Sequence, residues 1–267
     1  MTARHGGWAV AACAAMVMGL TGCGGEGGKA GDDGGSDGGK GGATESPTSL
    51  DIERLPGPEI AKRAKAEQRA ATSFRLVTGT QKPEASGKWD VTMDTAGNCV
   101  GSWRQDSRGS YEAIKHGKKA WIKPDRQFWN YSARPESGWP DLFTGKWLRG
   151  TPSSKILESV FTACDMRRLV HDATSVLNDD VTKGPTVIVE GQKAITLKAE
   201  DPKTGNPVTL YVATEGKPYP LKLEQGDETA PTTAIFTDYE KPVPNTTPPE
   251  GETVNVALLE TPGRRAD

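Results

Sequence analysis

The sequence predicts an α+β domain in which a strongly curved antiparallel sheet wraps around a few helices. Two runs of short alternating strands, over residues 74–123 and 187–239, predict the sheet. One helical pattern precedes the first run and another lies between the two runs. About ten strands and two or three helical pieces define this class, and so few helices cover a sheet face only if the sheet curls around them.

The first helix is expected over residues 56–72, PGPEIAKRAKAEQRAAT, where Ile60 and Ala64 belong to a narrow stripe of small apolar residues. Such a stripe suits a helix that lies on a curved sheet. The second helix follows Ser153 and Ser154, which are favourable N-cap residues, and has an apolar stripe over residues 156–161.

Both strand runs read as antiparallel meanders, in which each strand turns into the next. Gly97-Asn98, for example, is a hairpin signal between two alternating segments. An aromatic-rich stretch at 125–152 interrupts the strands, and residues 254–258 are expected to add an edge strand. The main strands are expected at residues 74–78, 88–94, 99–105, 111–114, 120–123, 187–189, 194–200, 208–214, 221–224 and 234–239.

Large apolar side chains on the inward strand faces form the expected core and the candidate lining of a cavity. Strand alternation is the basis for grouping them. The candidates are Phe74, Leu76, Trp89, Val91, Met93, Trp103, Val187, Val189, Leu210 and Val212. Ile195 and Leu197 share this pattern. A solid core and a hollow one produce the same alternation, so both interpretations stay open.

The N-terminus reads as an export signal. Residues 1–22 contain Arg4 and an apolar stretch of about thirteen residues, which is shorter than a membrane-spanning helix. Leu20-Thr21-Gly22-Cys23 resembles the lipobox of bacterial lipoproteins, and the resemblance implies that the Cys23 thiol carries a diacylglycerol. The alternative is an ordinary signal peptide followed by a chance cysteine.

A glycine-rich tether is expected at residues 23–55. Residues 24–49 hold eleven of the 32 glycines and too few apolar groups to offset the entropy of ordering. Roughly 30 residues of this composition have an r.m.s. span of about 30 Å. The expected organisation is therefore signal peptide, tether, folded domain over residues 56–245, and Pro-rich tail over 246–267.

The four cysteines predict one disulfide. Cys13 leaves with the signal peptide and Cys23 is assigned to the lipid, so Cys99 and Cys164 remain in an exported domain, which favours their pairing. A redox pair and a metal site are the alternatives, but neither cysteine belongs to a CxxC motif.

Composition and motifs argue against several function classes. A net charge of −2 does not suit a nucleic-acid partner. Gly109-Ser110-Tyr111 lacks the second glycine of a nucleophile elbow, and Asn178-Asp179-Asp180 fits a capping turn better than a metal site. We therefore expect no enzymatic activity, no metal and no cofactor.

Several segments, in matching order, resemble the LolA-like lipoproteins of actinobacteria, of the LppX/LprAFG type. They are SFRLVTG, GNCVGSW, GKKAWIK, GKWL, TKGPTVIVEGQKAITL, YVATEGKPYPLKLE and FTDYEKPV, and the resemblance covers roughly residues 56–245. It implies a half-barrel, a curved antiparallel sheet wrapped over helices with an apolar cavity between them. It also implies lipid or acyl cargo that is passed across the cell envelope.

The resulting hypothesis is a monomeric lipoprotein, anchored on the extracytoplasmic face of the cell membrane through its N-terminal diacylglycerol. It would bind a lipid or acyl chain in the half-barrel cavity and could act as a carrier. One alternative is an envelope interaction or sensing module without cargo. A third, suggested by the six tryptophans between Trp89 and Trp147, is a polysaccharide-binding sandwich.

Overall fold

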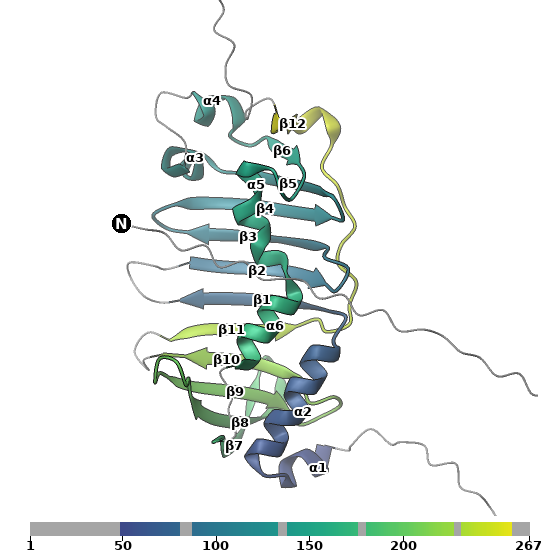
Figure 1. The fold of residues 1–267 in the computed structure, drawn as a ribbon, viewed down its shortest axis with the longest axis vertical. Coiled ribbons are helices and arrows are strands. Elements are labelled where there is room, and N and C mark those ends of the chain that lie inside the picture. The colour runs from purple at the N-terminus through teal and green to yellow at the C-terminus, as the bar shows by residue number, and fades with distance from the viewer. Residues whose placement is uncertain (1–48, 81–86, 133–137, 176–179, 227–230, 258–267) are drawn as a thin grey trace, which may run out of the picture. The chain divides into compact units, whose positions relative to one another are not determined.

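The computed structural model describes residues 49–80, 87–132, 138–175, 180–226 and 231–257. Its centre is a twelve-stranded open sheet (Figure 1) with the order β12-β6-β5-β4-β3-β2-β1-β11-β10-β9-β8-β7. Ten of the eleven strand pairings are antiparallel, and the short β12 pairs parallel with β6. The predicted α+β class is confirmed, but the expectation of an entirely antiparallel sheet is wrong at this one edge.

The strands follow the predicted meanders closely. They are β1 (Ser73–Thr80), β2 (Gly87–Asp94), β3 (Cys99–Gln105), β4 (Gly109–His116), β5 (Lys119–Pro124), β6 (Trp147–Gly150), β7 (Thr182–Val189), β8 (Gln192–Glu200), β9 (Pro207–Ala213), β10 (Pro220–Gln225), β11 (Thr232–Thr237) and β12 (Thr253–Asn255). The strand that the sequence does not predict is β6, which is four residues long and lies in the aromatic-rich stretch.

The helices that pack on the sheet lie on one of its faces. The helical elements are α1 (Ser49–Arg54), α2 (Gly57–Ala70), α3 (Arg126–Ser132), α4 (Trp139–Phe143), α5 (Lys155–Phe161), η2 (Thr162–Cys164), α6 (Met166–Ser175) and η3 (Glu250–Glu252). α5 and α6 cross the strands from β5 towards β11, and α2 lies over the β8–β10 region (Figure 1). None of the helices in the described part of the chain has the length and apolarity needed to cross a bilayer.

The core lies between this inner sheet face and the helices. Its most deeply buried apolar members are Ile60, Phe74, Met93, Ile122, Leu148, Leu157, Leu197 and Val212. Ile60 and Ala64 of α2 are fully buried in it, so the predicted small-residue stripe is the packing face of the helix. Ile52 of α1 also belongs to the core, although α1 lies in the stretch assigned to the tether.

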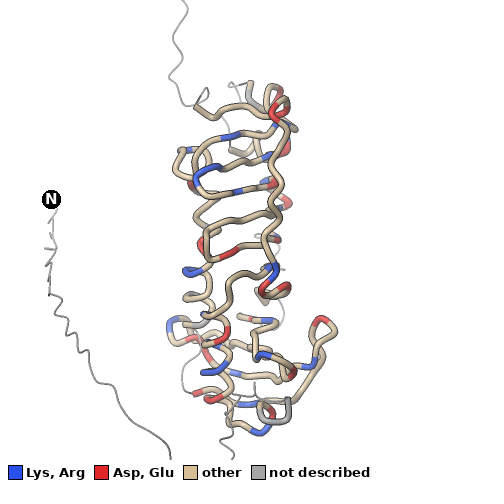
Figure 2. The backbone as a smooth tube through the Cα atoms, turned by 90° about the vertical axis from the view of Figure 1, so that its right-hand side faces the viewer, with Lys and Arg blue, Asp and Glu red and all other residues tan. Residues whose placement is uncertain are grey.

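The outer face carries two smaller apolar clusters. Trp121 and Trp147 pack with Ile114 in one of them, at the β4–β6 end of the sheet. These tryptophans are therefore buried on the side that faces away from the helices. Charged residues of both signs occur from one end of the sheet to the other in the view of Figure 2.

Gly101 allows β2 and β3 to approach each other closely. A Cβ atom at this position would press against the carbonyl oxygen of Asp90 and lie 2.7 Å from the Cα atom of Val91. Glycine within a strand marks such close backbone contacts and bends. Gly101 is therefore part of what lets the sheet curl around α5 and α6.

The segment after β11 forms a strap. It runs alongside the strand ends to the far edge of the sheet, where β12 pairs with β6 (Figure 1, yellow). Val256 is buried there, and its amide donates to the carbonyl of Arg149 at 2.9 Å. The edge strand predicted at 254–258 is thus present as β12, in parallel rather than antiparallel pairing.

Candidate functional site

Most of the ten candidate cavity residues share the inner face of the sheet. Eight of them lie there: Phe74, Leu76, Trp89, Val91, Met93, Trp103, Leu210 and Val212. Six of the eight are buried, whereas Trp89 and Trp103 are half-buried. Strand alternation was sufficient to group these residues because β1, β2, β3 and β9 have regular pairing over the positions concerned.

Val187 and Val189 lie on the opposite face, so placing them with the other eight is wrong. They pack in an outer cluster with Ala194, Ala213 and Leu221. The cause is a register shift between Lys183 and Thr186 of β7, where one extra residue reverses the inward and outward positions that follow. Gly184 and Pro185 lie at the shift, and both residue types are typical of bulges, so the sequence contained a signal that alternation alone does not show.

A continuous row of side chains crosses the inner face from β4 to β9. Its members pair directly across neighbouring strands, in the order Tyr111, Trp103, Trp89, Thr78, Ala234, Leu223 and Leu210. We call these seven residues the inner row. The row joins the two meanders, because Thr78 belongs to β1 and Ala234 to β11.

The aromatic end of the inner row is only partly covered. Trp103 stacks on Tyr111 with ring centroids 5.2 Å apart, and Trp89 and Phe128 meet Tyr111 edge-on at 6.4 and 5.5 Å. Burial raises the pKa of the Tyr111 hydroxyl well above its usual value, so this ring stays neutral. Trp89, Trp103 and Phe128 are half-buried, which leaves an apolar aromatic strip partly accessible to solvent.

The other end of the inner row borders a small enclosed cavity. The cavity lies between α2, α6 and strands β9–β11, and its free volume is about 10 Å³. Its lining is Lys65, Gln68, Ala173, Leu210, Pro220, Leu223 and Phe236. This space holds about one water molecule, so it is too small to hold an acyl chain.

Gln68 is the polar side chain at this cavity. It is 1 % exposed, and its Oε1 lies 2.7 Å from the Tyr239 hydroxyl. Among the described residues, its Nε2 has no hydrogen-bond partner. A buried donor left in this state costs about 1–3 kcal/mol. The sequence contained a signal for its position, because Gln68 follows Ile60 and Ala64 at the same helical spacing of four.

Tyr239 holds the Gln68 amide in place. Its hydroxyl also lies 2.7 Å from the carbonyl oxygen of Pro220, and its ring stacks on Tyr219 at 3.9 Å. Burial is the main reason that the pKa of Tyr239 is raised well above its usual value. Asp238 and Glu240, on either side of it, have positive φ angles of 53° and 61°, which non-glycine residues rarely adopt. Tyr239 is thus fixed in position by its packing and by the backbone on both sides.

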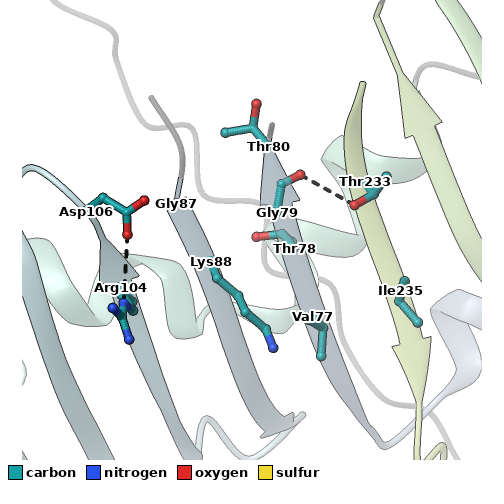
Figure 3. Close-up of a pocket in the computed structure, with 10 residues that line it drawn as sticks. All are labelled: Val77, Thr78, Gly79, Thr80, Gly87, Lys88, Arg104, Asp106, Thr233 and Ile235. Atoms are coloured by element: carbon teal, nitrogen blue, oxygen red, sulfur yellow. Dashed lines mark hydrogen bonds and ion pairs between the residues drawn. The ribbon is translucent and has the colours of Figure 1, made fainter. Parts of the chain in front are cut away.

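A second hollow, of about 370 Å³, lies on the outer face (Figure 3). The ends of β1, β2, β3 and β11 line it, and its polar groups include Lys88 and the Arg104–Asp106 pair, with Arg104 Nε 3.9 Å from Asp106 Oδ1. Both members of the pair are largely exposed. The hollow is open to solvent and lies on the opposite side of the sheet from the inner row.

Cys99 and Cys164 form a disulfide bond, with their Cα atoms 5.8 Å apart. The bond joins β3 to η2, the link between α5 and α6, as expected for a tie between the sheet and the helical segment. Both cysteines are buried and paired, which leaves neither as a metal ligand. Within the described residues, no three His, Cys, Asp or Glu side chains gather in a metal-like cluster.

Ser110, the serine of the incomplete nucleophile elbow, donates a hydrogen bond to Asp125 at 2.7 Å. The signal peptide, Cys23, most of the tether and Asn178-Asp179 lie outside the described residues.

No family model matches the sequence, and no curated protein matches it. Among solved structures, LprF from Mycobacterium bovis has a TM-score of 0.51 at 14% identity, over 72% of this chain and 96% of that one. Lipoprotein LppX from Mycobacterium tuberculosis has a TM-score of 0.45 at 11% identity, over 70% and 96%. A LolA superfamily protein from Nitrosomonas europaea covers similar shares, 72% and 96%, at 10% identity and a TM-score of 0.26. The likeness to LprF, with a TM-score above 0.5, shows that this chain has the same fold as LprF.

Proposed function

We propose that this protein is a membrane-anchored lipoprotein of the extracytoplasmic face that binds a lipid or acyl chain along the inner row. The observation that carries the proposal is the partly accessible aromatic strip of Trp89, Trp103 and Phe128, which continues across the sheet to the enclosed cavity. A lipid site needs apolar concave surface and a few polar groups, and it needs no catalytic residue.

The energetics suit an apolar chain. Burial contributes about 0.8 kcal/mol per methylene, so ten methylenes contribute about 8 kcal/mol before the costs of ordering the ligand. The cavity between α2 and α6 is too small for the chain, so the chain lies on the exposed aromatic strip. Passage of cargo between membranes, as a carrier, is an extension of this proposal.

Two adjacent residues of β11 test the binding face. Ala234 belongs to the inner row, and Ile235 faces the outer hollow. In the full chain carrying Cys23→Ala, Ala234→Glu is expected to weaken binding of a fluorescent fatty acid by at least about tenfold, because it places a charge beside the chain. Ile235→Glu is expected to leave binding unchanged.

Titration of the fatty acid, followed by its fluorescence, measures both affinities, and circular dichroism checks that each variant is folded. If Ile235→Glu weakened binding and Ala234→Glu did not, the ligand would lie in the outer hollow instead. Absence of binding by the parent chain, together with no lipid in organic extracts of the purified protein, would favour the interaction or sensing module without cargo.

Anchoring is tested at Cys23. Cys23→Ala removes the thiol that would carry the diacylglycerol, so the protein is expected to move from the membrane fraction to the soluble fraction of lysed cells. A single acyl chain binds membranes only weakly, whereas two chains anchor stably. Immunoblots of both fractions measure the change, with Cys13→Ala as the control that should stay in the membrane. Retention of the Cys23→Ala protein would contradict lipidation.

A further inference from the structure

We infer that the ligand of the inner row is a single apolar chain that ends in an oxygen-bearing group, and that the Gln68 amide binds this oxygen. The inference rests on the proposed function and adds the polar end of the ligand and the residue that recognises it. Its starting point is a buried amide beside an apolar cavity, with one end bonded and the other without a partner among the described residues.

Among the described residues around Gln68, no arrangement gives both the nitrogen and the oxygen of its amide a hydrogen-bond partner. A tyrosine hydroxyl has one proton, and Tyr239 has two acceptors at 2.7 Å, Gln68 Oε1 and the Pro220 carbonyl. Rotating the Gln68 amide by half a turn lets its N–H donate to Tyr239 and Tyr239 donate to Pro220, and it leaves the amide oxygen without a partner instead of the nitrogen. A hydroxyl group supplied by a ligand satisfies either orientation, because it can accept from the amide N–H or donate to the amide oxygen.

The amide is also positioned before any ligand arrives. Tyr239 is stacked on Tyr219, and the Tyr219 hydroxyl donates to Glu240 at 2.8 Å. The carboxylate of Glu240 accepts in turn from the backbone amide of Thr72 at 3.2 Å, just after α2. This network joins α2 to the end of β11 and prevents Gln68 from turning towards solvent. Binding to a hydrogen-bonding group that is already fixed avoids the entropic cost of ordering it.

The cavity lies where the end of a ligand chain on the inner row would be. Leu223 and Leu210 are members of both, and Ala234, the next residue of the row, is half-buried. From Leu223 on β10 to Trp103 on β3 the row crosses four strand intervals, which at about 4.8 Å each span about 19 Å. A chain of this length extends from the aromatic strip to Gln68.

The size of the cavity selects what reaches the amide. A free volume of about 10 Å³ admits one water-sized group, which is the size of a hydroxyl or a carbonyl oxygen. The chain itself therefore stays on the row and only its terminal group enters. Lys65 is the charged member of the lining and is half-buried, so movement of this side chain can open the cavity.

Two probes of equal chain length test the inference, hexadecan-1-ol and hexadecane. Each tritiated probe is partitioned between phosphatidylcholine vesicles and the full chain carrying Cys23→Ala. The parent chain should prefer the alcohol. Gln68→Met has a similar shape without the amide, and it should weaken binding of the alcohol by about tenfold while binding of hexadecane stays the same.

Two further variants complete the test. Gln192→Met changes an exposed glutamine at the start of β8 and should bind both probes like the parent. Ala173→Leu fills the cavity from α6 without altering the amide, and it should weaken binding of the alcohol to the affinity of hexadecane.

The outcomes separate the two proposals. If the parent chain binds neither probe, the proposed function is wrong and this inference fails with it. If the parent binds both probes and Gln68→Met keeps the parent's preference for the alcohol, lipid binding stands, and the inference about Gln68 is overturned. Should Ala173→Leu retain the full preference, the terminal group does not enter this cavity and the inference is likewise overturned.

Discussion

Replacing Cys99 and Cys164 together by alanine is expected to lower the free energy of unfolding by about 4 kcal/mol. The bond closes a loop with a sequence separation of 65 residues, and the chain-entropy relation for a loop of this length gives this magnitude. The bond also joins β3 to η2, so its loss frees the connection between α5 and α6 from the sheet. The helices over the core should therefore be the first elements to lose protection from hydrogen exchange.

Urea unfolding followed by circular dichroism measures the loss. Reduction of the parent protein with dithiothreitol should produce nearly the same shift, since both treatments remove the cross-link. The reductant should not affect the double variant, which serves as the control for general effects of the reagent. A double variant as stable as the parent would show that the helices are held by packing alone.

A single methyl group at Gly101 is expected to destabilise the protein by about 3 kcal/mol, the upper part of the range for overpacking. In Gly101→Ala the new Cβ would lie against the Asp90 carbonyl and 2.7 Å from the Val91 Cα, both of which are backbone atoms of β2. Backbone atoms cannot move aside by a change of rotamer, so β2 and β3 have to separate. The inner row is then disturbed at Trp89 and Trp103, which pair across the same two strands.

Gly251→Ala is the matched control, because a Cβ at Gly251 meets no atom within 4 Å. Its stability should equal that of the parent in the same urea titration. If Gly101→Ala unfolded at the urea concentration of this control, the close approach of β2 and β3 would not be a requirement of the fold.

Sequence alone was sufficient for the elements whose pattern depends on local chemistry. The alternation at Trp89, Val91 and Met93 follows from the pleat of a strand, and the helix around Ile60 and Ala64 follows from a spacing of four. The disulfide was predicted from the number of cysteines and from the expected export of the domain. Each of these inferences needs only neighbouring residues or the number of cysteines, and each was confirmed.

The features that sequence could not predict depend on contacts between distant segments. Val187 and Val189 are a different case, because the bulge that turns them outward lies within the β7–β8 hairpin and includes Gly184 and Pro185. The short strand β6 exists because β5 and the C-terminal β12 pair with its two edges, and β12 comes about a hundred residues later. Gln68 looked like an ordinary polar helix residue, and only the packing of α2 against Tyr239 gives it a role.

The strand order also determines which strands pair late in folding and how ligand binding affects that pairing. Strands β1–β6 and β7–β11 are each joined to their chain neighbours, and the two sets meet only where β1 pairs with β11, as at Leu76 and Phe236. Closing this seam brings together residues about 160 positions apart, so it is expected to be a late and slow event. The inner row crosses the seam between Thr78 and Ala234. A ligand chain lying on the row therefore contacts both halves of the sheet. Its binding is expected to stabilise the pairing of β1 with β11.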